Sequence, residues 1–291
     1  MYYHEFIKER LLDTAHTLIA GTTGSGKSVL LNSVIFTALN AINPVCVFID
    51  LKRVELVRYK NIFNCAMFVT EPEEVNGALD SVIDMMERRY QQMEKVGLVK
   101  TTETPVYVFI DELADLINNK GVLPRLVKIG RLGRTAQIHL VCATQDPSRR
   151  TLPAQLMQNF TCCVALRCKS SIESRQVIGI AGAEELPQYG QAILWDAKGK
   201  KRFEVPMTPE EDIAACCAEH AGSHSAQAAL PQTTGEAPVT IYRAPSGRPG
   251  LNLAIALARA GYNFVKLVFV VVKVGFIALY RWMTTDRCDY E

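Results

Sequence analysis

A run of glycines and small polar residues, GTTGSGKS at positions 21–28, lies between two strongly apolar segments. The segment before it, HTLIA, is typical of a short buried strand, and SVLLNSVIFTALN after it is typical of an apolar helix. Glycines in such a connection allow backbone angles that turn successive N–H groups toward one point. The feature therefore predicts an α/β layer with an anion-binding loop at a helix N-terminus.

The spacing of Gly21, Gly26, Lys27 and Ser28 matches G-x-x-x-x-G-K-[ST], the P-loop of nucleotide-binding proteins. Lys27 is expected to reach the β- and γ-phosphates of ATP, and the Ser28 hydroxyl to ligate Mg²⁺. The alternative is a glycine-rich turn before a helix, but the full pattern and both flanks favour the P-loop. The predicted ATP-binding residues of the loop are Gly21, Thr22, Thr23, Gly24, Ser25, Gly26, Lys27 and Ser28.

Strand and helix patterns alternate from Thr17 to about Glu204. Apolar strands are expected in PVCVFID, VYVFIDE, IHLVCATQ and CCVALRC, with a hairpin in QAILWDAKGKKRFEVP. A long helix is expected over residues 71–97 and a second over residues 124–137, the latter weakened by two glycines. Such alternation predicts an α/β fold, with a mostly parallel sheet and helices on both faces.

Two acidic residues end the strand VYVFIDE, and they supply the second half of an ATP site. Asp111 is expected in the Mg²⁺ shell beside Ser28, as a Walker B aspartate. Glu112 follows at once and is predicted to polarise the attacking water as a general base. Thr144 and Gln145 end the strand HLVCATQ, and Gln145 is predicted to sense the γ-phosphate or to orient water. Two surface acids capping a strand are the alternative for the first pair.

The composition supports one large domain with an appendage. Of the 291 residues 48% are hydrophobic, which allows a sizeable core, and the net charge of +2 neither favours nor excludes a nucleic-acid partner. Nine cysteines without a C-x-x-C pair, and an N-terminus without a secretory signal, predict a cytoplasmic main domain with free thiols.

The C-terminal quarter differs in composition from the rest. We expect a main domain over residues 1–218, a flexible linker over 219–250, an apolar or amphipathic helix over 251–283, and a short tail over 284–291. The apolar segment is long enough to cross a bilayer, yet Lys266 and Lys273 interrupt it. With Arg259 and Tyr280 these lysines recur every seventh residue and share one helix face. The pattern favours attachment to the inner face of the cell membrane over a soluble oligomerisation helix.

Several segments, taken together, resemble the motor domain of the FtsK/SpoIIIE DNA translocases. They are HTLIAGTTGSGKSVLLN, FIDLKRVEL, MMERRYQQM, VFIDELADL, RTAQIHLVCATQDPS and SSIESRQVIGIAGAEELPQYGQAILW, in the family's order from about Ala15 to Trp195. The resemblance implies a RecA-like P-loop fold, a hexameric ring with ATP sites between subunits, and double-stranded DNA driven through the pore. It also implies an arginine that acts on the neighbouring subunit's ATP, for which Arg134 matches best. Arg131 and Arg175 are the alternatives.

The parts around the motor differ from those of bacterial chromosome translocases. Those proteins carry N-terminal membrane spans, a long linker, a small α/β domain and a C-terminal winged helix, none of which this sequence predicts. We therefore expect a short motor of a plasmid, phage or integrative conjugative element, by analogy. An FtsK-like ATPase driving protein export in type VII secretion is the main alternative, and a single motor domain favours DNA. An inactive nucleotide-binding scaffold is disfavoured by Lys27, Asp111 and Glu112.

A basic stretch lies between the catalytic strands. No acidic residue occurs from Leu116 to Gln145, whereas five basic residues do: Lys120, Arg125, Lys128, Arg131 and Arg134. This charge could line a positive interface or pore that contacts DNA phosphates. It could equally pair with acids on a neighbouring subunit.

Overall fold

The computed structural model describes residues 2–221. Residues 222–250 of the predicted linker, the apolar segment 251–283 and the tail 284–291 lie outside the described residues. Within the described part, no helix combines the length and the apolar character that a membrane crossing requires.

One eight-stranded sheet organises the described part, with the strand order β3-β2-β4-β5-β1-β6-β7-β8. Its strands are β1 (Thr17–Ala20), β2 (Val45–Ile49), β3 (Cys65–Val69), β4 (Val106–Ile110), β5 (Ile138–Thr144), β6 (Cys162–Ala165), β7 (Gln191–Asp196) and β8 (Gly199–Glu204). The strands from β3 to β6 pair in parallel, and the β7–β8 hairpin adds two antiparallel strands. The prediction of a mostly parallel sheet is therefore confirmed. The expected strands did not include β3, because periodicity cannot assign a five-residue apolar run.

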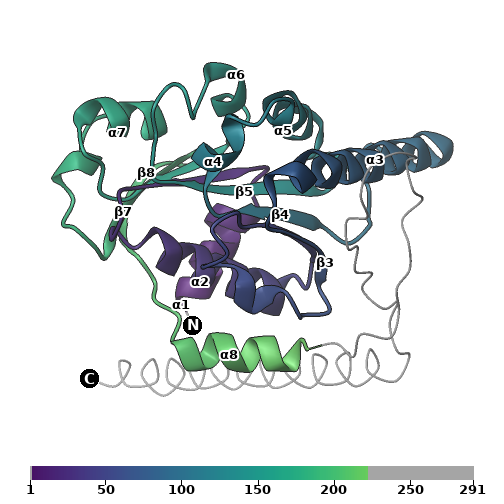
Figure 1. Ribbon diagram of the computed structural model, residues 1–291, viewed down its shortest axis with the longest axis horizontal. Helices are drawn as coiled ribbons and strands as arrows, with labels where there is room; N and C mark the ends of the chain where they lie inside the picture. The colour runs from purple at the N-terminus through teal and green to yellow at the C-terminus, as the bar shows by residue number, and fades with distance from the viewer. Residues whose placement is uncertain (1, 222–291) are drawn as a thin grey trace, which may run out of the picture. The chain divides into compact units, whose positions relative to one another are not determined.

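Helices cover both faces of the sheet, as Figure 1 shows. On one face lie α3 (Pro72–Val96), α4 (Leu113–Ile117), α5 (Val122–Leu132), α6 (Ala154–Met157) and α7 (Ser171–Ile178). On the other lie α1 (Tyr2–Ile7), α2 (Lys27–Ala41) and α8 (Glu210–Glu219). Three further single turns are the π-helical η1 (Lys8–Leu12) and the 3-10 turns η2 (Val57–Tyr59) and η3 (Ala183–Glu185).

Strand side chains alternate between two hydrophobic cores, one on each face. Leu18 and Ala20 of β1 belong to the core beneath α3 and α5, whereas Ile19 belongs to the core beneath α2. This alternation follows from the two-residue period of a strand. Because both faces are covered, the strands read as continuous apolar runs, which is why the sequence pattern identified most of them.

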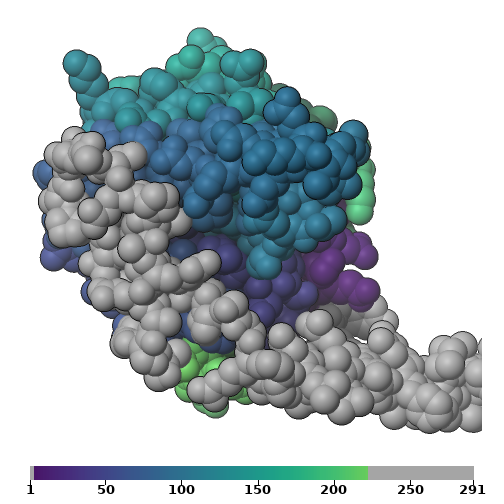
Figure 2. Space-filling model, turned by 90° about the vertical axis from the view of Figure 1, so that its right-hand side faces the viewer, coloured from purple at the N-terminus to yellow at the C-terminus, as the bar shows by residue number. Residues whose placement is uncertain are grey.

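The long helix α3 begins and ends at the predicted positions. Pro72 stands in its first turn, where its missing N–H costs no hydrogen bond. Gly97 ends it in the left-handed conformation, at φ 69°. Much of the face shown in Figure 2 is formed by α3 and the segment that follows it, both coloured blue.

The helix expected over residues 124–137 occupies Val122–Leu132 instead, so the predicted bounds were wrong. Gly133 closes it, with its N–H donating to the Ile129 carbonyl at 2.7 Å. A Cβ at Gly133 would lie only 2.5 Å from the Ile138 carbonyl oxygen, so the chain turns tightly here into β5. The turn places Arg134 after the helix rather than on it.

Part of the basic stretch on α5 is neutralised within the chain. Arg125 pairs with Asp80 at 2.7 Å, and Lys128 pairs with Glu87 at 2.9 Å. Both acids lie on α3, which packs beside α5. These two charges therefore stabilise contact between two helices of the same chain, whereas Arg131 and Arg134 stay exposed.

Two buried histidines connect the start of β1 with β5. The Leu140 N–H donates to Nδ1 of His16 at 2.9 Å, so this nitrogen is unprotonated. Nδ1 of His139 lies 3.0 Å from the carbonyl oxygens of both Thr14 and Ala15 and donates to them. Burial, and secondly the nearby His139, lowers the pKa of His16 from 6.5 to about 4, and burial also lowers that of His139.

We expect acid to destabilise the domain through these histidines. The unfolded chain binds protons near pH 6.5 that folded His16 does not accept until about pH 4, so stability is lost as the pH falls through that window. Lowering the pH from 7 to 5 should reduce the free energy of unfolding by on the order of 2 kcal/mol through His16 alone. Urea unfolding at the two pH values measures this loss. The variant His16→Asn keeps an acceptor for Leu140 and should show a smaller loss; an equal loss would contradict the assignment.

Candidate functional site

The predicted P-loop connects β1 to α2 and wraps the first turn of that helix. Gly24 and Gly26 adopt left-handed conformations, at φ 75° and 97°, that other residues rarely adopt. A Cβ at Gly21 would lie 2.6 Å from the Ser25 hydroxyl and 2.8 Å from Cβ of Leu166, so a side chain there would collide. The loop therefore has the backbone shape that its glycine spacing predicted.

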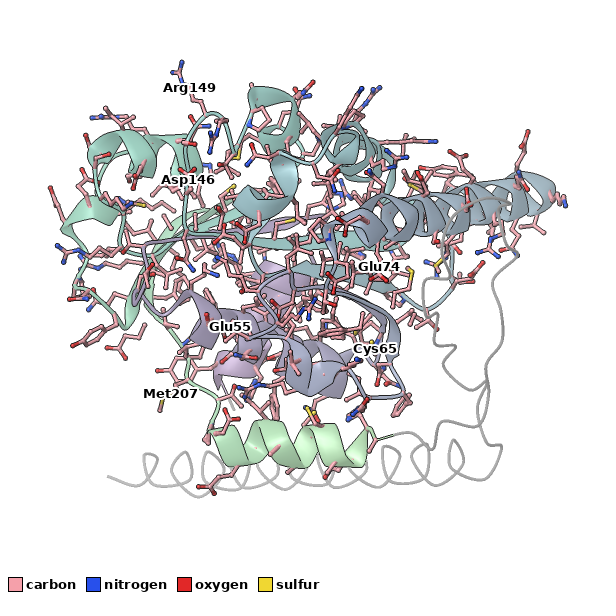
Figure 3. The ribbon with its side chains drawn as sticks, viewed as in Figure 1. Glu55, Cys65, Glu74, Asp146, Arg149 and Met207 are labelled. Carbon is pink, nitrogen blue, oxygen red and sulfur yellow. The ribbon has the colours of Figure 1, made fainter. Side chains whose placement is uncertain are left out.

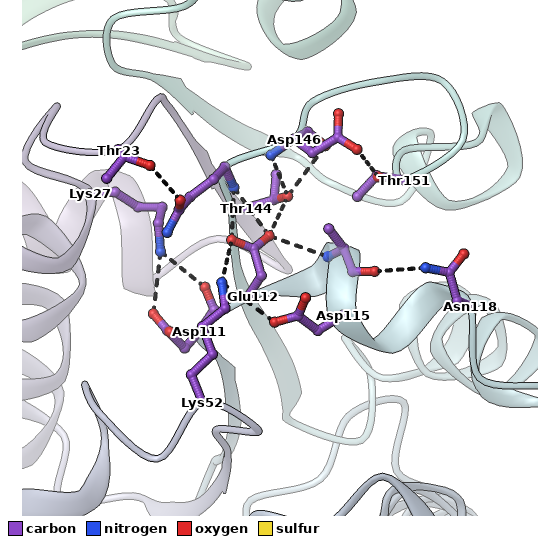
Figure 4. A network of polar contacts seen from close by, with 12 residues as sticks. Thr23, Lys27, Lys52, Asp111, Glu112, Asp115, Asn118, Thr144, Asp146 and Thr151 are labelled. Carbon is purple, nitrogen blue, oxygen red and sulfur yellow. Dashed lines mark hydrogen bonds and ion pairs between the residues drawn. The ribbon is translucent and has the colours of Figure 1, made fainter.

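Lys27 and Asp111 meet in the interior. The Lys27 side chain is 4% exposed, and its Nζ donates to the backbone oxygen of Asp111 at 3.1 Å and to Oδ1 at 3.2 Å (Figure 4). Burial raises the pKa of Asp111, and the Lys27 ammonium opposes that shift. The parallel register of β1, β5 and β4 brings their carboxyl ends to one edge, which joins the P-loop to the acidic strand end.

Glu112 is buried and is held by several donors at once. Its Oε1 accepts from the Thr144 hydroxyl at 2.7 Å and from the Ala114 N–H at 3.3 Å, which caps α4. The Gln145 N–H lies 3.1 and 3.0 Å from its two oxygens. The carboxylate is thus oriented by the tips of two neighbouring strands, β4 and β5.

Sequence reasoning missed Lys52, which follows β2. Its Nζ lies 3.6 Å from Oε2 of Glu112 and 3.4 Å from Oδ2 of Asp115. Burial lowers the pKa of Lys52, but Glu112 and Asp115 more than offset this, and the net shift is upward. The only signal was its place in FIDLKRVEL, two residues after an aspartate that ends a buried strand.

Gln145 is bound to the P-loop itself. The Thr23 hydroxyl donates to its Oε1 at 2.7 Å. The next residues form a braced loop, since Asp146 accepts hydrogen bonds from the hydroxyls of Ser148 and Thr151. Arg149 in this loop points away from the protein (Figure 3). Gln145 therefore contacts the P-loop, and its predicted role toward the γ-phosphate stays a prediction.

The three candidate arginines lie apart from this cluster. Arg134, Arg131 and Arg175 are all exposed, and Arg175 donates to the Ser171 hydroxyl at 3.2 Å. Among residues 2–221, no hydrogen bond or ion pair joins them to the P-loop, Asp111 or Glu112. The role of Arg134 in a neighbour's site stays a prediction.

The loop fits the phosphates of a nucleotide and its magnesium ion. The buried Ser25 hydroxyl has no hydrogen-bond partner within the described part of the chain. Gly24 and Gly26 leave space for an anion beside the first turn of α2, where unpaired N–H groups favour negative charge. Ser28 and Asp111 are oxygen donors of the kind that Mg²⁺ prefers. They would hold the ion if it binds as the P-loop pattern predicts.

Comparison with known proteins agrees with this geometry. Residues 2–103 match the FtsK/SpoIIIE family. The DNA translocase FtsK of Chlorobaculum tepidum is 32% identical over 237 residues, covering 72% of this chain and 30% of that protein. The DNA translocase SpoIIIE of Bacillus subtilis is 31% identical over 226 residues, covering 69% and 29%. The matching segment therefore spans about a third or less of these curated relatives.

Two solved structures share the fold. The pCW3 conjugation coupling protein TcpA superposes with a TM-score of 0.65 at 21% identity, over 72% of this chain and 65% of that one. The cytoplasmic domain of the type VII secretion ATPase EccC from Thermomonospora curvata gives 0.63 at 25% identity, over 72% and 28%. With the sheet order and the P-loop, these findings confirm the RecA-like fold, and the chain belongs to the FtsK/SpoIIIE family of P-loop ATPases.

Proposed function

We propose that this chain hydrolyses ATP and uses the energy to move double-stranded DNA. The observation that carries the proposal is the meeting of Lys27, Asp111 and Glu112 at one edge of the sheet, in a chain similar to DNA translocases. A buried lysine paired with one carboxylate, next to a second carboxylate at the end of the same strand, can both bind a triphosphate and activate water. A nucleotide-binding scaffold would require only the first of these.

The chemistry divides among the residues of the cluster. P-loop N–H groups and Lys27 would bind the phosphates, and Glu112 would accept a proton from the attacking water. Thr144 and the Gln145 backbone hold the Glu112 carboxylate in one orientation. Mg²⁺, held by Ser28 and Asp111, would neutralise charge on the phosphate oxygens.

The ATP site also bears on how the subunits assemble and where the motor works. We propose a hexameric ring, in which Arg134 of one subunit completes the ATP site of the next. We further propose that the motor serves a plasmid, phage or integrative conjugative element and that its apolar segment attaches it to the inner face of the membrane. The likeness to a conjugation coupling protein supports a mobile element.

Duplex DNA should stimulate the ATPase severalfold, with no preference for sequence. The effect should fall steeply with salt, because phosphate contacts release counterions. Steady-state ATP turnover of the full chain, with and without duplex DNA of varied sequence, measures this. The Glu112→Gln protein, which we expect to hydrolyse ATP about 100-fold more slowly, is the matched control. An unchanged rate over the whole range of salt and DNA concentrations would contradict DNA translocation.

Protein export is the second candidate, favoured by the similarity to the type VII secretion ATPase EccC. The same assay separates the two functions. An export ATPase should ignore duplex DNA and respond to a peptide from an exported protein. Stimulation by DNA together with no response to such peptides supports the first candidate.

A further inference from the structure

The sheet order restricts how a nucleotide can lie across the P-loop. Strand β1 lies between β5 and β6. Asp111, Glu112 and Gln145 all lie on the β5 side, so the γ-phosphate must point that way. The nucleobase must then extend in the opposite direction, over the end of β6 and the start of β7, which runs antiparallel to it. These directions for the γ-phosphate and the base hold if the site binds ATP, as proposed above.

One loop on that side lies against the P-loop, namely Leu186–Gly190, which precedes β7. Nε2 of Gln188 is 3.8 Å from the place of a Cβ on Gly24, and the Gly190 nitrogen is 4.0 Å from that on Gly26. Since both glycines belong to the predicted phosphate cradle, the loop borders the space that a bound nucleotide would occupy.

Hydrogen bonds tie this loop to the P-loop through the end of β6. The Thr22 N–H donates to the Arg167 carbonyl at 2.9 Å, and the Arg167 guanidinium donates to the Leu186 carbonyl at 3.1 Å. At the other end, the Val205 N–H donates to the Gly190 carbonyl at 3.0 Å. The two loops are therefore held in a defined relation.

Tyr189 is the aromatic residue of this loop, and the residue is 70% exposed. In the described part of the chain, its ring makes no ring contact and its hydroxyl no hydrogen bond. Gly190 beside it adopts φ 86°, a left-handed turn that few other residues would tolerate. An unpartnered aromatic ring on an anchored loop offers a face on which a planar base can stack.

We infer that Leu186–Gly190 forms a nucleobase subsite, in which Tyr189 stacks on the adenine ring of ATP. In this subsite Tyr189 adds to the affinity for the base, whereas the P-loop provides the affinity for the phosphates. Stacking of a base on an aromatic side chain contributes about 1–3 kcal/mol, which corresponds to about fivefold to 140-fold in affinity. A ligand that lacks the base, such as inorganic tripolyphosphate, should gain nothing from Tyr189.

The test compares the affinities of the full chain for ATP and for tripolyphosphate, each with Mg²⁺ and without DNA. Tyr189→Ala should weaken ATP binding about tenfold and leave tripolyphosphate binding unchanged, whereas Tyr189→Phe should keep the affinity for both. Trp195→Ala is the matched control, because Trp195 is also an exposed aromatic but pairs with Cys163, near the start of β6. That control should bind both ligands as the unmodified chain does.

Three results would overturn the inference. They are normal ATP binding by Tyr189→Ala, an equal loss for both ligands, and an unmodified chain that binds ATP no better than tripolyphosphate. The proposed function fails in a different way. If duplex DNA does not affect the ATPase but Tyr189→Ala still weakens ATP binding selectively, the subsite stands and DNA translocation does not.

Discussion

Replacing Glu112 by glutamine should leave ATP bound and slow its hydrolysis by about 100-fold or more. Glutamine has nearly the shape of glutamate and can still accept from the Thr144 hydroxyl and the Ala114 N–H. It cannot take a proton from water, so only the chemical step is lost. ATP binding by fluorescence or calorimetry and single-turnover hydrolysis separate the two effects.

The matched comparison is Lys27→Ala, which should remove ATP binding itself. Lys27 is also the partner of buried Asp111, so this variant needs a stability measurement beside the binding assay. If the Glu112→Gln protein hydrolyses ATP at the unmodified rate, Glu112 is not the general base. Gln145 would then be examined next, since it is the other candidate at the strand tips.

Replacing Arg134 by alanine should lower the ATPase rate of the assembled protein by about 1,000-fold, as loss of an arginine finger does in other P-loop enzymes. ATP binding should persist, because Arg134 makes no contact with the P-loop of its own chain in residues 2–221. Turnover and nucleotide affinity, measured on the same preparation, distinguish loss of catalysis from loss of binding.

Mixing variants tests whether Arg134 acts on a neighbour. In a ring containing Arg134→Ala and Glu112→Gln subunits, some interfaces combine an intact arginine with an intact glutamate, so part of the activity should return. Mixed rings must be demonstrated by co-purification of two affinity tags. Full activity of Arg134→Ala alone would dismiss the finger. Arg131→Ala and Arg175→Ala, which replace arginines that are also exposed, serve as the comparison.

The local sequence pattern was sufficient to predict the P-loop, most strands and the long helix α3. Each depends on residues close together in the chain: the glycine spacing from Gly21 to Gly26, the continuous apolar runs of a sheet covered on both faces, and Pro72 with Gly97 at the helix ends. Asp111 and Glu112 were also accessible from sequence, since a strand that ends in two acids has a short-range signature.

Other features depended on long-range contacts, which no local pattern encodes. Helix α5 stops at Leu132 because Gly133 packs against the entry to β5. Lys52 reaches Glu112, and Thr144 orients it, only because β2, β4 and β5 are adjacent in the sheet. The loop that carries Tyr189 lies beside the P-loop because β6 and the segment before β7 fold back to β1, across more than 160 residues of chain. Sequence by itself thus determined the glycine loop and the two acids that we propose to bind phosphate and activate water. The tertiary structure decided which side chains contact them and which loop borders the P-loop. The reason is physical: phosphate binding uses the backbone of one short loop, but orientation requires side chains from several strands.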